Sequence, residues 1–276
     1  MADASWHHQT KNCIYPWKSF NVTFYHFHGR NQIMKENQYD NPLFFEKYAQ
    51  MERSKKGLQG AGEWHALQKM LPDFHGKTVL DLGCGYGWHC KYAADNGAAA
   101  VIGADISQKM LDTAQQKNAA PSIRYVCAAM EDLTFAENQF DIVLSSLAFH
   151  YVRDYEPLIK QIATWIKPGG SFIFSVEHPV FTSYGSQDWY YDESGKILHF
   201  PVDHYYEEGK RTAVFLGEPV TKYHRTLTTY VGALLQNGFT ITQLIEPQPP
   251  LCMMDLPGMK DEMRRPMMLL IGAIKL

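Results

Sequence analysis

Three alternate glycines mark the part of the chain best suited to bind a ligand. Gly83, Gly85 and Gly87 follow an apolar run, residues 79–82, which predicts a buried strand that enters a tight turn. A residue without a side chain lets the backbone adopt a positive φ and pass close to a ligand. We expect a helix to begin directly after the turn, so that its free N–H groups face the same ligand. The pattern therefore predicts a nucleotide-type site.

The spacing of these glycines disfavours two common ligands. A dinucleotide fingerprint needs a third glycine where Trp88 stands, and a triphosphate loop needs Gly-Lys followed by Ser or Thr, which is absent after Gly87. Asp81, which lies just before the glycines, favours a ligand with a positively charged group over one made of phosphates.

The elements that position this turn follow an alternating pattern. Apolar runs at residues 78–82, 99–104, 123–127, 142–147 and 171–176 predict strands that are buried on both faces. Helical spacing lies between them, most clearly in the stripe of Leu158, Ile162, Trp165 and Ile166, which residues 167–170 should stop. A further helix over residues 227–235 and strands at 239–245 and 267–274 close the chain. Alternating strands and helices predict right-handed βαβ units and a parallel sheet.

The segment Asp-Leu-Gly-Cys-Gly-Tyr-Gly at residues 81–87 resembles the first motif of the class I S-adenosylmethionine-dependent methyltransferases. The resemblance is strong over residues 76–177 and looser toward the C-terminus. Lys-Pro-Gly-Gly at residues 167–170 matches the loop that precedes the fifth strand in that family. The resemblance implies a Rossmann-like α/β fold, with a seven-stranded, mostly parallel sheet, helices on both faces and a last antiparallel strand. It also implies S-adenosylmethionine as the cofactor.

The resemblance further implies a set of cofactor-binding residues. Asp105, 20 residues after Gly85, matches the acid that binds the ribose, and one carboxylate can accept hydrogen bonds from both hydroxyls. Ile106 would pack on the adenine and Glu131 would accept from its amino group, while Ala129 stands where the family usually has an aspartate. The complete predicted set is Asp81, Gly83, Cys84, Gly85, Gly87, Asp105, Ile106, Met130, Glu131, Ser146, Leu147, Tyr39 and Tyr48.

Three residues near the ends of the fourth and fifth strands are candidates for catalysis. His150 follows the fourth strand, and Glu177 and His178 follow the fifth, so all three should lie near the site of transfer. Either histidine could act as a general base near neutral pH, and either could instead make a plain polar contact. Glu177 has the same alternatives, including that of holding a backbone amide.

The regions outside the motif core suggest a division of the chain. Residues 1–33 are rich in aromatic residues and histidine and form an extension of uncertain origin, residues 34–75 form a helical lid, and residues 76–276 form the methyltransferase domain. We expect one charged helical stretch over residues 34–51, in which Tyr39 and Tyr48 either stabilise the sulfonium by cation–π attraction or pack as ordinary core. Residues 178–225 predict a hairpin-bearing insertion, with its turn around residues 208–209, that either lines the acceptor pocket or is solvated. The acceptor candidates there are Tyr205, Tyr206, Arg211, Tyr223, His224 and Arg225.

The composition excludes several classes of protein. The chain has 276 residues, 45% of them hydrophobic and 20% charged, which is typical of a globular protein. A net charge of −3 argues against nucleic acid as a partner. The sequence contains no run of 18 apolar residues of the kind that spans a membrane. We therefore expect a cytoplasmic protein. The five cysteines lie without any C-x-x-C pair, which indicates neither a disulfide framework nor a metal site.

The predicted function is transfer of a methyl group to an oxygen, nitrogen or carbon atom of a small-molecule acceptor. An Asn-Pro-Pro-Tyr motif, typical of nucleic-acid amino methyltransferases, is absent after the fourth strand, where residues 145–149 read Ser-Ser-Leu-Ala-Phe. The alternatives are an RNA or protein methyltransferase and a cofactor-binding protein of the same fold without turnover. The sequence predicts neither the acceptor nor the oligomeric state.

Overall fold

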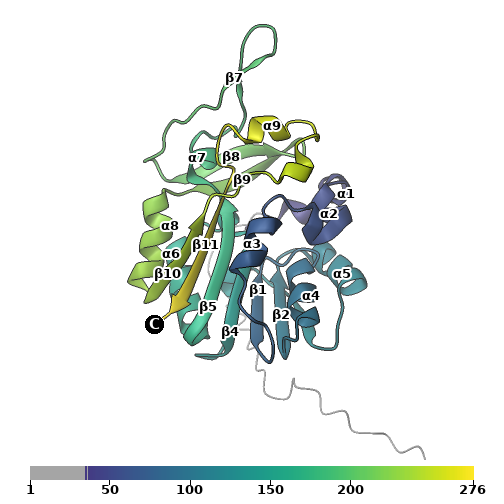
Figure 1. The fold of residues 1–276 in the computed structure, drawn as a ribbon, viewed down its shortest axis with the longest axis vertical. Helices are drawn as coiled ribbons and strands as arrows, with labels where there is room; N and C mark the ends of the chain where they lie inside the picture. Colours follow the sequence, from purple (N-terminus) through teal and green to yellow (C-terminus); the bar gives the residue numbers. More distant parts are fainter. Residues whose placement is uncertain (1–34, 36) are drawn as a thin grey trace, which may run out of the picture.

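Seven strands form one sheet at the centre of the molecule (Figure 1), in a computed structural model that describes residue 35 and residues 37–276. The order across the sheet is β10-β11-β5-β4-β1-β2-β3. Only β11 runs antiparallel to its neighbours, β5 and β10. The strands are β1 (Thr78–Leu82), β2 (Ala100–Asp105), β3 (Ile123–Cys127), β4 (Phe140–Ser146), β5 (Ile166–Glu177), β10 (Phe239–Ile245) and β11 (Met268–Lys275). The predicted Rossmann-like sheet is confirmed.

The strand order creates a crevice at one end of the sheet. The chain places β2 and β3 on one side of β1 and then crosses to place β4 and β5 on the other. The connections after β1 and β4 therefore diverge, and ligands of open α/β sheets bind where this divergence occurs, outside the carboxyl ends of the strands.

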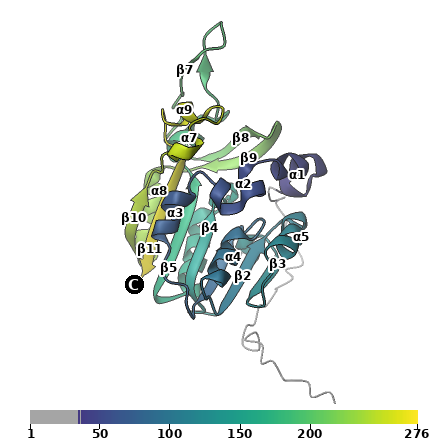
Figure 2. The same cartoon turned by 45° about the vertical axis from the view of Figure 1, so that its right-hand side comes forward.

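Helices cover both faces of the sheet. On one face, α3 and α4 bury Trp64, Leu67 and Cys90 in one apolar cluster, and on the other, α6 and α8 bury Ile162 and Leu234 in another. Figure 2 shows α3, α4 and α5 on the near side of the strands. The bounds are α3 (Trp64–Met70), α4 (Trp88–Asp95), α5 (Gln108–Lys117), α6 (Tyr155–Trp165) and α8 (Leu227–Gln236). None of the helices in the part of the chain that the structure describes is long and apolar enough to cross a membrane.

The predicted stripe of α6 is wrong at its last position. The helix ends at Trp165, and Ile166 is the first residue of β5. Pairing with β4 then shifts register, from Phe140 opposite Ile166 to Ile142 opposite Ser171. The segment 167–170 is thus an irregular start of the strand, because Pro168 lacks an N–H group and Gly169 has a φ of 76°.

The lid is more broken than the sequence predicted. A 3₁₀ turn, Gln38–Asp40, precedes α1 (Pro42–Ala49), and α2 (Glu52–Lys56) follows after a break at Met51. Asn41 ends the first turn and caps α1, since its side chain accepts hydrogen bonds from the N–H groups of Leu43 and Phe44. The predicted single helix over residues 34–51 is therefore wrong in its described part. The predicted extension, residues 1–33, lies outside the described residues.

The insertion after β5 contains two hairpins. A short helix, α7 (Pro179–Ser183), leads to the small pair β6 (Tyr190–Tyr191) and β7 (Ile197–His199), and then to β8 (Gly209–Phe215) and β9 (Glu218–His224). The turn of the second hairpin is at Leu216 and Gly217, with φ values of 56° and 79°, so its predicted place at residues 208–209 is wrong. Gly209 begins β8 instead. Figure 2 shows this hairpin and the lid together above the carboxyl ends of the strands.

Candidate active site

One large cavity of about 390 Å³ lies at the carboxyl ends of β1 to β5. The glycine turn and the strand ends form its floor, the lid forms one wall, and Phe215 of the second hairpin contributes to another. Phe44 of the lid packs against Phe215 with ring centroids 5.7 Å apart, and Lys47 pairs with Glu218 at 3.1 Å. The lid and the hairpin therefore contact each other beside the cavity.

The three glycines of the turn have different surroundings. All three have a positive φ, between 52° and 73°. A Cβ atom on Gly83 would clash with Ala148, at 2.4 Å, and one on Gly87 would clash with the Tyr125 hydroxyl, at 2.2 Å. Gly85 has nothing within 4 Å of that position and lines the cavity. A ligand can therefore approach the backbone at Gly85, whereas Gly87 packs against protein and is the N-cap residue of α4.

Asp105 lies at the end of β2 with both oxygens directed by backbone groups. The Gly85 N–H donates to Oδ2 at 2.8 Å, and the Ser107 N–H donates to Oδ1 at 2.9 Å. Burial raises the pKa of Asp105 to about 6, although these two hydrogen bonds oppose the shift. Each oxygen keeps a further lone pair for a ligand in the cavity.

Most of the other predicted cofactor residues line the same cavity. Ile106 and the pair Met130 and Glu131 extend the wall beyond Asp105, while Ser146 and Leu147 lie at the end of β4. Leu147 has a φ of 53°, a left-handed backbone that is rare outside glycine. Its N–H donates to the Ser175 carbonyl at 2.9 Å, which fixes this turn beside the cavity.

Three predicted cofactor residues do not line the cavity. Asp81 is 1% exposed, and its Oδ2 accepts a hydrogen bond from the Cys90 thiol at 3.3 Å, while its Oδ1 has no partner among the described residues. Cys84 is buried beside Cys90 and borders only a smaller hollow, and Gly87 contacts Tyr125 as described above. Asp81 and Gly87 border neither hollow, because β1 buries both of its faces and Gly87 packs against Tyr125. Cys84 borders the smaller hollow, so its contact with the cofactor stays a prediction.

The lid places both of its predicted tyrosines in the wall of the cavity. Tyr39 and Tyr48 lie with ring centroids 5.3 Å apart, and the Tyr39 hydroxyl lies 3.2 Å from that of Tyr151. Phe44, by contrast, is fully buried between the lid and the second hairpin. The aromatic stripe of the lid thus serves two purposes: part of it faces the cavity and part of it is core.

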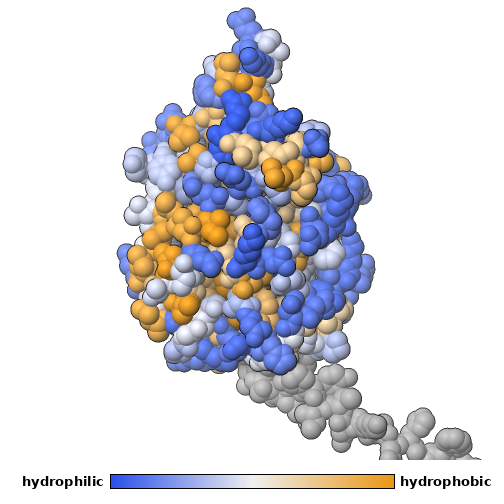
Figure 3. Space-filling model, viewed as in Figure 1, coloured by the Kyte–Doolittle hydropathy of each residue, from blue (hydrophilic) through white to orange (hydrophobic). Residues whose placement is uncertain are grey.

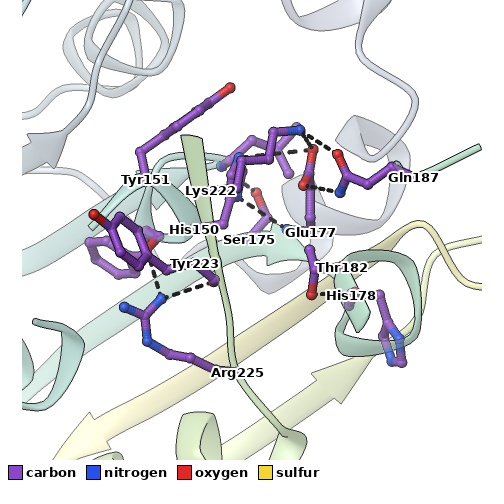
Figure 4. A network of polar contacts seen from close by, with 12 residues as sticks. His150, Tyr151, Ser175, Glu177, His178, Thr182, Gln187, Lys222, Tyr223 and Arg225 are labelled. Carbon is purple, nitrogen blue, oxygen red and sulfur yellow. Dashed lines mark hydrogen bonds and ion pairs between the residues drawn. The ribbon is translucent and has the colours of Figure 1, made fainter. Parts of the chain in front are cut away.

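A network of polar residues lies at the end of the cavity at β5, and its members His150 and Glu177 line the cavity (Figure 4). Lys222 of β9 donates to Glu177 Oε1 at 2.5 Å, and Gln187 donates to Glu177 Oε2 at 2.7 Å. Lys222 also donates to Gln187 Oε1 at 2.8 Å. Burial opposes ionisation, yet the positive charge of Lys222 and the hydrogen bonds from Lys222 and Gln187 hold the pKa of Glu177 below its usual range. Glu177 is therefore an ionised carboxylate in the wall of the cavity.

His150 lines this end of the cavity as a neutral imidazole. The backbone N–H of Glu177 donates to His150 Nδ1 at 3.3 Å, so the ring proton is on Nε2. Burial lowers the pKa of His150 to about 4, against the attraction of Glu177. This geometry does not favour His150 as a general base, because the nitrogen able to accept a proton is bonded to the backbone, and its catalytic role stays a prediction. His150 Nε2 can donate a hydrogen bond instead.

His178 lies outside the cavity, although the sequence placed it at the site of transfer. Its Nδ1 accepts from the Val180 N–H at 3.0 Å and caps α7, while Nε2 pairs with Glu246 at 2.8 Å. The prediction of a catalytic role is wrong for His178, because the chain turns into α7 directly after β5 and carries the side chain to the far side.

The sequence did not indicate a second, smaller hollow of about 70 Å³ that shares Arg53, Gly85 and Ser146 with the main cavity. Arg53 of the lid pairs with the buried carboxylate of Glu63, whose other oxygen, Oε2, has no hydrogen-bond partner among the described residues. Trp88 lines this hollow, and its buried Nε1 also has no partner among the described residues. A guanidinium, a free carboxylate oxygen and an indole N–H together suit a ligand that carries both a carboxylate and an ammonium group.

The hairpin residues predicted for the acceptor pocket do not line the cavity. Arg225 donates to the backbone carbonyls of Val152 and Arg153, and Tyr206 is 90% exposed. Phe215 and a methionine-rich C-terminal segment line it instead, with Met253, Leu256, Met259, Met267 and Met268. These positions follow no periodic pattern in the sequence.

Comparison with known proteins agrees with this geometry. A family model described as a methyltransferase domain matches residues 80–174. A crystal structure from Listeria monocytogenes, described as an S-adenosylmethionine-dependent methyltransferase, is 56% identical, with a TM-score of 0.76 over 80% of this chain and 99% of its own. An S-adenosylmethionine-dependent methyltransferase from Mesorhizobium loti is 39% identical, with a TM-score of 0.73 over 79% of this chain and 100% of its own. A Haemophilus influenzae protein, named only as uncharacterized, is 35% identical over 252 residues, 87% of this chain and 98% of its own.

The chain belongs to the class I S-adenosylmethionine-dependent methyltransferases. It is therefore an enzyme, and S-adenosylmethionine is its methyl donor. The residues present fit this donor: Gly85 leaves space beside the backbone, Asp105 lines the cavity with free lone pairs, and Glu63 keeps an unpaired buried oxygen.

Proposed function

We propose that the protein transfers the methyl group of S-adenosylmethionine to a small molecule that binds in the main cavity beside Glu177 and His150. One observation carries the proposal: a single cavity joins the glycine turn and Asp105 at one end to this polar pair at the other. The lid and the second hairpin contact each other next to the cavity, which favours a small acceptor over an RNA or protein chain.

The geometry supports a definite placement of the donor. The ribose hydroxyls would donate to Asp105, and the adenine would lie among Ile106, Met130 and Glu131. The amino-acid end would reach Arg53 and Glu63. This leaves the sulfonium near Leu147, with Tyr39 and Tyr48 close enough in the cavity wall to stabilise a positive charge.

The enzyme's own contribution would be alignment and exclusion of water. The bound donor supplies an electrophilic methyl group, so the protein needs mainly to hold the acceptor in line with it. Good alignment of two reactants is worth on the order of 7 to 11 kcal/mol. The lid, the hairpin and the methionine-rich segment surround this point with mostly apolar side chains, which strengthens the polar contacts that remain.

Calorimetry and a labelling assay test the proposal. S-adenosylhomocysteine, the demethylated donor, should bind at micromolar concentration, and NAD at the same concentration should release no heat. Incubation of the enzyme with a small-metabolite extract and a donor carrying a labelled methyl group should give a labelled small molecule. Label in RNA or protein instead, or binding without any product, would contradict the proposal.

A cytoplasmic location stays a prediction.

A further inference from the structure

The polar end of the cavity holds one hydrogen-bond donor beside one acceptor. His150 Nε2 carries a proton, since Nδ1 is bonded to the Glu177 N–H at 3.3 Å. The nearest oxygen of the Glu177 carboxylate is 4.0 Å from Nε2, which is too long for a hydrogen bond. Both side chains line the cavity, so a ligand atom there can contact the two together.

The carboxylate of Glu177 is held in place from outside the cavity. Lys222 binds Oε1 and Gln187 binds Oε2, and each comes from the insertion (Figure 4). These contacts fix the orientation of the carboxylate and keep it ionised, and each of its oxygens retains a lone pair for a ligand. Lys222 also places a positive charge directly behind Glu177, which disfavours a cationic acceptor.

This arrangement discriminates between acceptor atoms. A hydroxyl oxygen has two lone pairs, so it can accept a hydrogen bond from His150 with one, attack the methyl group with the other, and donate its proton to Glu177. An amine nitrogen has a single lone pair, which a hydrogen bond from His150 would occupy and remove from the reaction. A carbon nucleophile offers no lone pair to His150 at all.

We propose that the methyl acceptor is the oxygen of a hydroxyl group on a molecule with an apolar body, a conclusion that rests on the proposed function. The oxygen–carbon bond forms as the sulfur–carbon bond of the donor breaks, the hydroxyl proton passes to the Glu177 carboxylate, and the donor leaves as a neutral thioether. A carboxylate with a low pKa suffices, because the oxygen becomes strongly acidic as its bond to carbon forms.

The apolar body follows from the methionine-rich part of the cavity wall. Met253, Leu256 and Met259 line the cavity from the C-terminal segment, and Met267 and Met268 continue the wall. Figure 3 shows apolar surface over the segment that carries α9 (Met259–Glu262), and Leu251 and Leu256 are 90% and 41% exposed there. Thioether side chains adapt to irregular apolar shapes, which suits a ring or alkyl chain.

Product analysis tests the acceptor atom directly. The enzyme is incubated with a metabolite extract and a donor whose methyl group carries carbon-13, and the carbon-13 chemical shift of the product separates O-methyl from N-methyl and C-methyl groups. We expect an O-methyl product that extracts into organic solvent. An N-methyl or C-methyl product would overturn the inference while the proposed function stands, and the absence of any product would overturn both.

Two variants test the roles of the residues on that product. Glu177→Gln should lower kcat by about a hundredfold or more, as loss of a general base does, while the affinity for S-adenosylhomocysteine stays unchanged. The matched control is Glu246→Gln, which removes an ion-paired carboxylate outside the cavity. Met259→Gln should raise KM for the acceptor several-fold, and Met263→Gln, at an exposed position of the same segment, should not. Full activity of Glu177→Gln would contradict the proton transfer.

Discussion

At the scale of the residue, the site depends on whether a side chain at the end of a strand lines the cavity or is buried in the core. The spacing of Gly85 and Asp105 predicted their position, because a strand end and a tight turn fix both backbones. Asp81 has the same chemistry as Asp105, yet it is buried against Cys90. The sequence could not separate the two, since a strand buried on both faces shows no alternation that marks its sides.

Asp105 predicts a pH-dependent affinity for the donor. With a pKa raised to about 6, the carboxylate is ionised at pH 7.5 and loses its charge as the pH falls through 6. The affinity for S-adenosylhomocysteine should therefore fall about tenfold between pH 7.5 and pH 5, because the protonated group is a poorer acceptor for the ribose hydroxyls. Calorimetry at both values measures this. Asp105→Asn should bind S-adenosylhomocysteine more weakly at pH 7.5, and its affinity should change little with pH. If the affinity of this variant depends on pH as that of the parent does, Asp105 is not the source of the dependence.

Trp88 predicts a contact that involves only the amino-acid end of the donor. Trp88→Phe removes the indole N–H from the small hollow and should weaken S-adenosylhomocysteine about tenfold, the cost of one hydrogen bond to a charged group. The affinity for 5′-methylthioadenosine, which lacks the amino-acid end, should not change. Trp64→Phe is the matched control, because its Nε1 is also buried without a partner among the described residues but borders neither hollow. Equal losses for both nucleosides would argue for a structural role.

Asp81 predicts an effect on stability instead of binding. Burial raises its pKa to about 7, so between pH 4 and pH 7 the folded protein holds a proton that the unfolded chain releases. The free energy of unfolding should therefore fall as the pH rises through this window. Asp81→Asn removes this loss, so in urea unfolding at pH 8 it should be more stable than the parent by up to about 4 kcal/mol, the energy of a pKa shift of about three units.

Asp141 supplies the control of opposite sign. Burial opposes its ionisation, but Lys167 and Thr78 outweigh this and hold the pKa of Asp141 below its usual value. The ionised Asp141 carboxylate therefore stabilises the folded protein at pH values above the usual pKa of aspartate, and this stabilisation is lost as the pH falls through the lowered pKa. Asp141→Asn should accordingly have a lower free energy of unfolding than the parent at pH 8. If both variants change stability in the same direction at pH 8, the assignment of these two carboxyls is wrong.

At the scale of the element, two segments far apart in the sequence complete the cavity. Phe44 of α1 is fully buried against Ala213 and Val220 of the second hairpin, and neither element has another large apolar cluster of its own. The sequence predicted that a lid and a hairpin exist, from aromatic content and turn residues. It did not predict that they pack together, because such a contact depends on side chains about 170 residues apart.

Phe44 predicts coupling between the lid and the hairpin. Phe44→Ala should cost about 3 to 5 kcal/mol of local packing, and the loss should fall on α1, β8 and β9 more than on the central strands. Hydrogen exchange should then become faster in these three elements and stay slow in β1 and β4, with weaker binding of S-adenosylhomocysteine. Leu43→Ala, at a position that is 53% exposed on the same helix, should change neither. Uniformly faster exchange throughout the sheet would contradict a local role.

At the scale of the whole molecule, local patterns predicted the sheet and long-range contacts built the site. The strands from β1 to β5 were predictable because each is an apolar run between turn signals, and the connections of βαβ units have one hand. The pair of Arg53 and Glu63 was not predictable, because neither residue lies in a motif and only folding of the lid brings them to Ser146. The same holds for Lys222 and Glu177, which are 45 residues apart.

The placement of Lys222 has a consequence for how such enzymes diversify. The half of the cavity proposed to bind the donor comes from β1 to β4 and the lid, whereas the residues that orient Glu177 and those proposed to surround the acceptor come from segments after β5. Mutations in those segments can therefore alter which molecule is modified without disturbing the nucleoside-binding half. Evolution can therefore replace one acceptor substrate by another while the nucleoside-binding half of the cavity is retained.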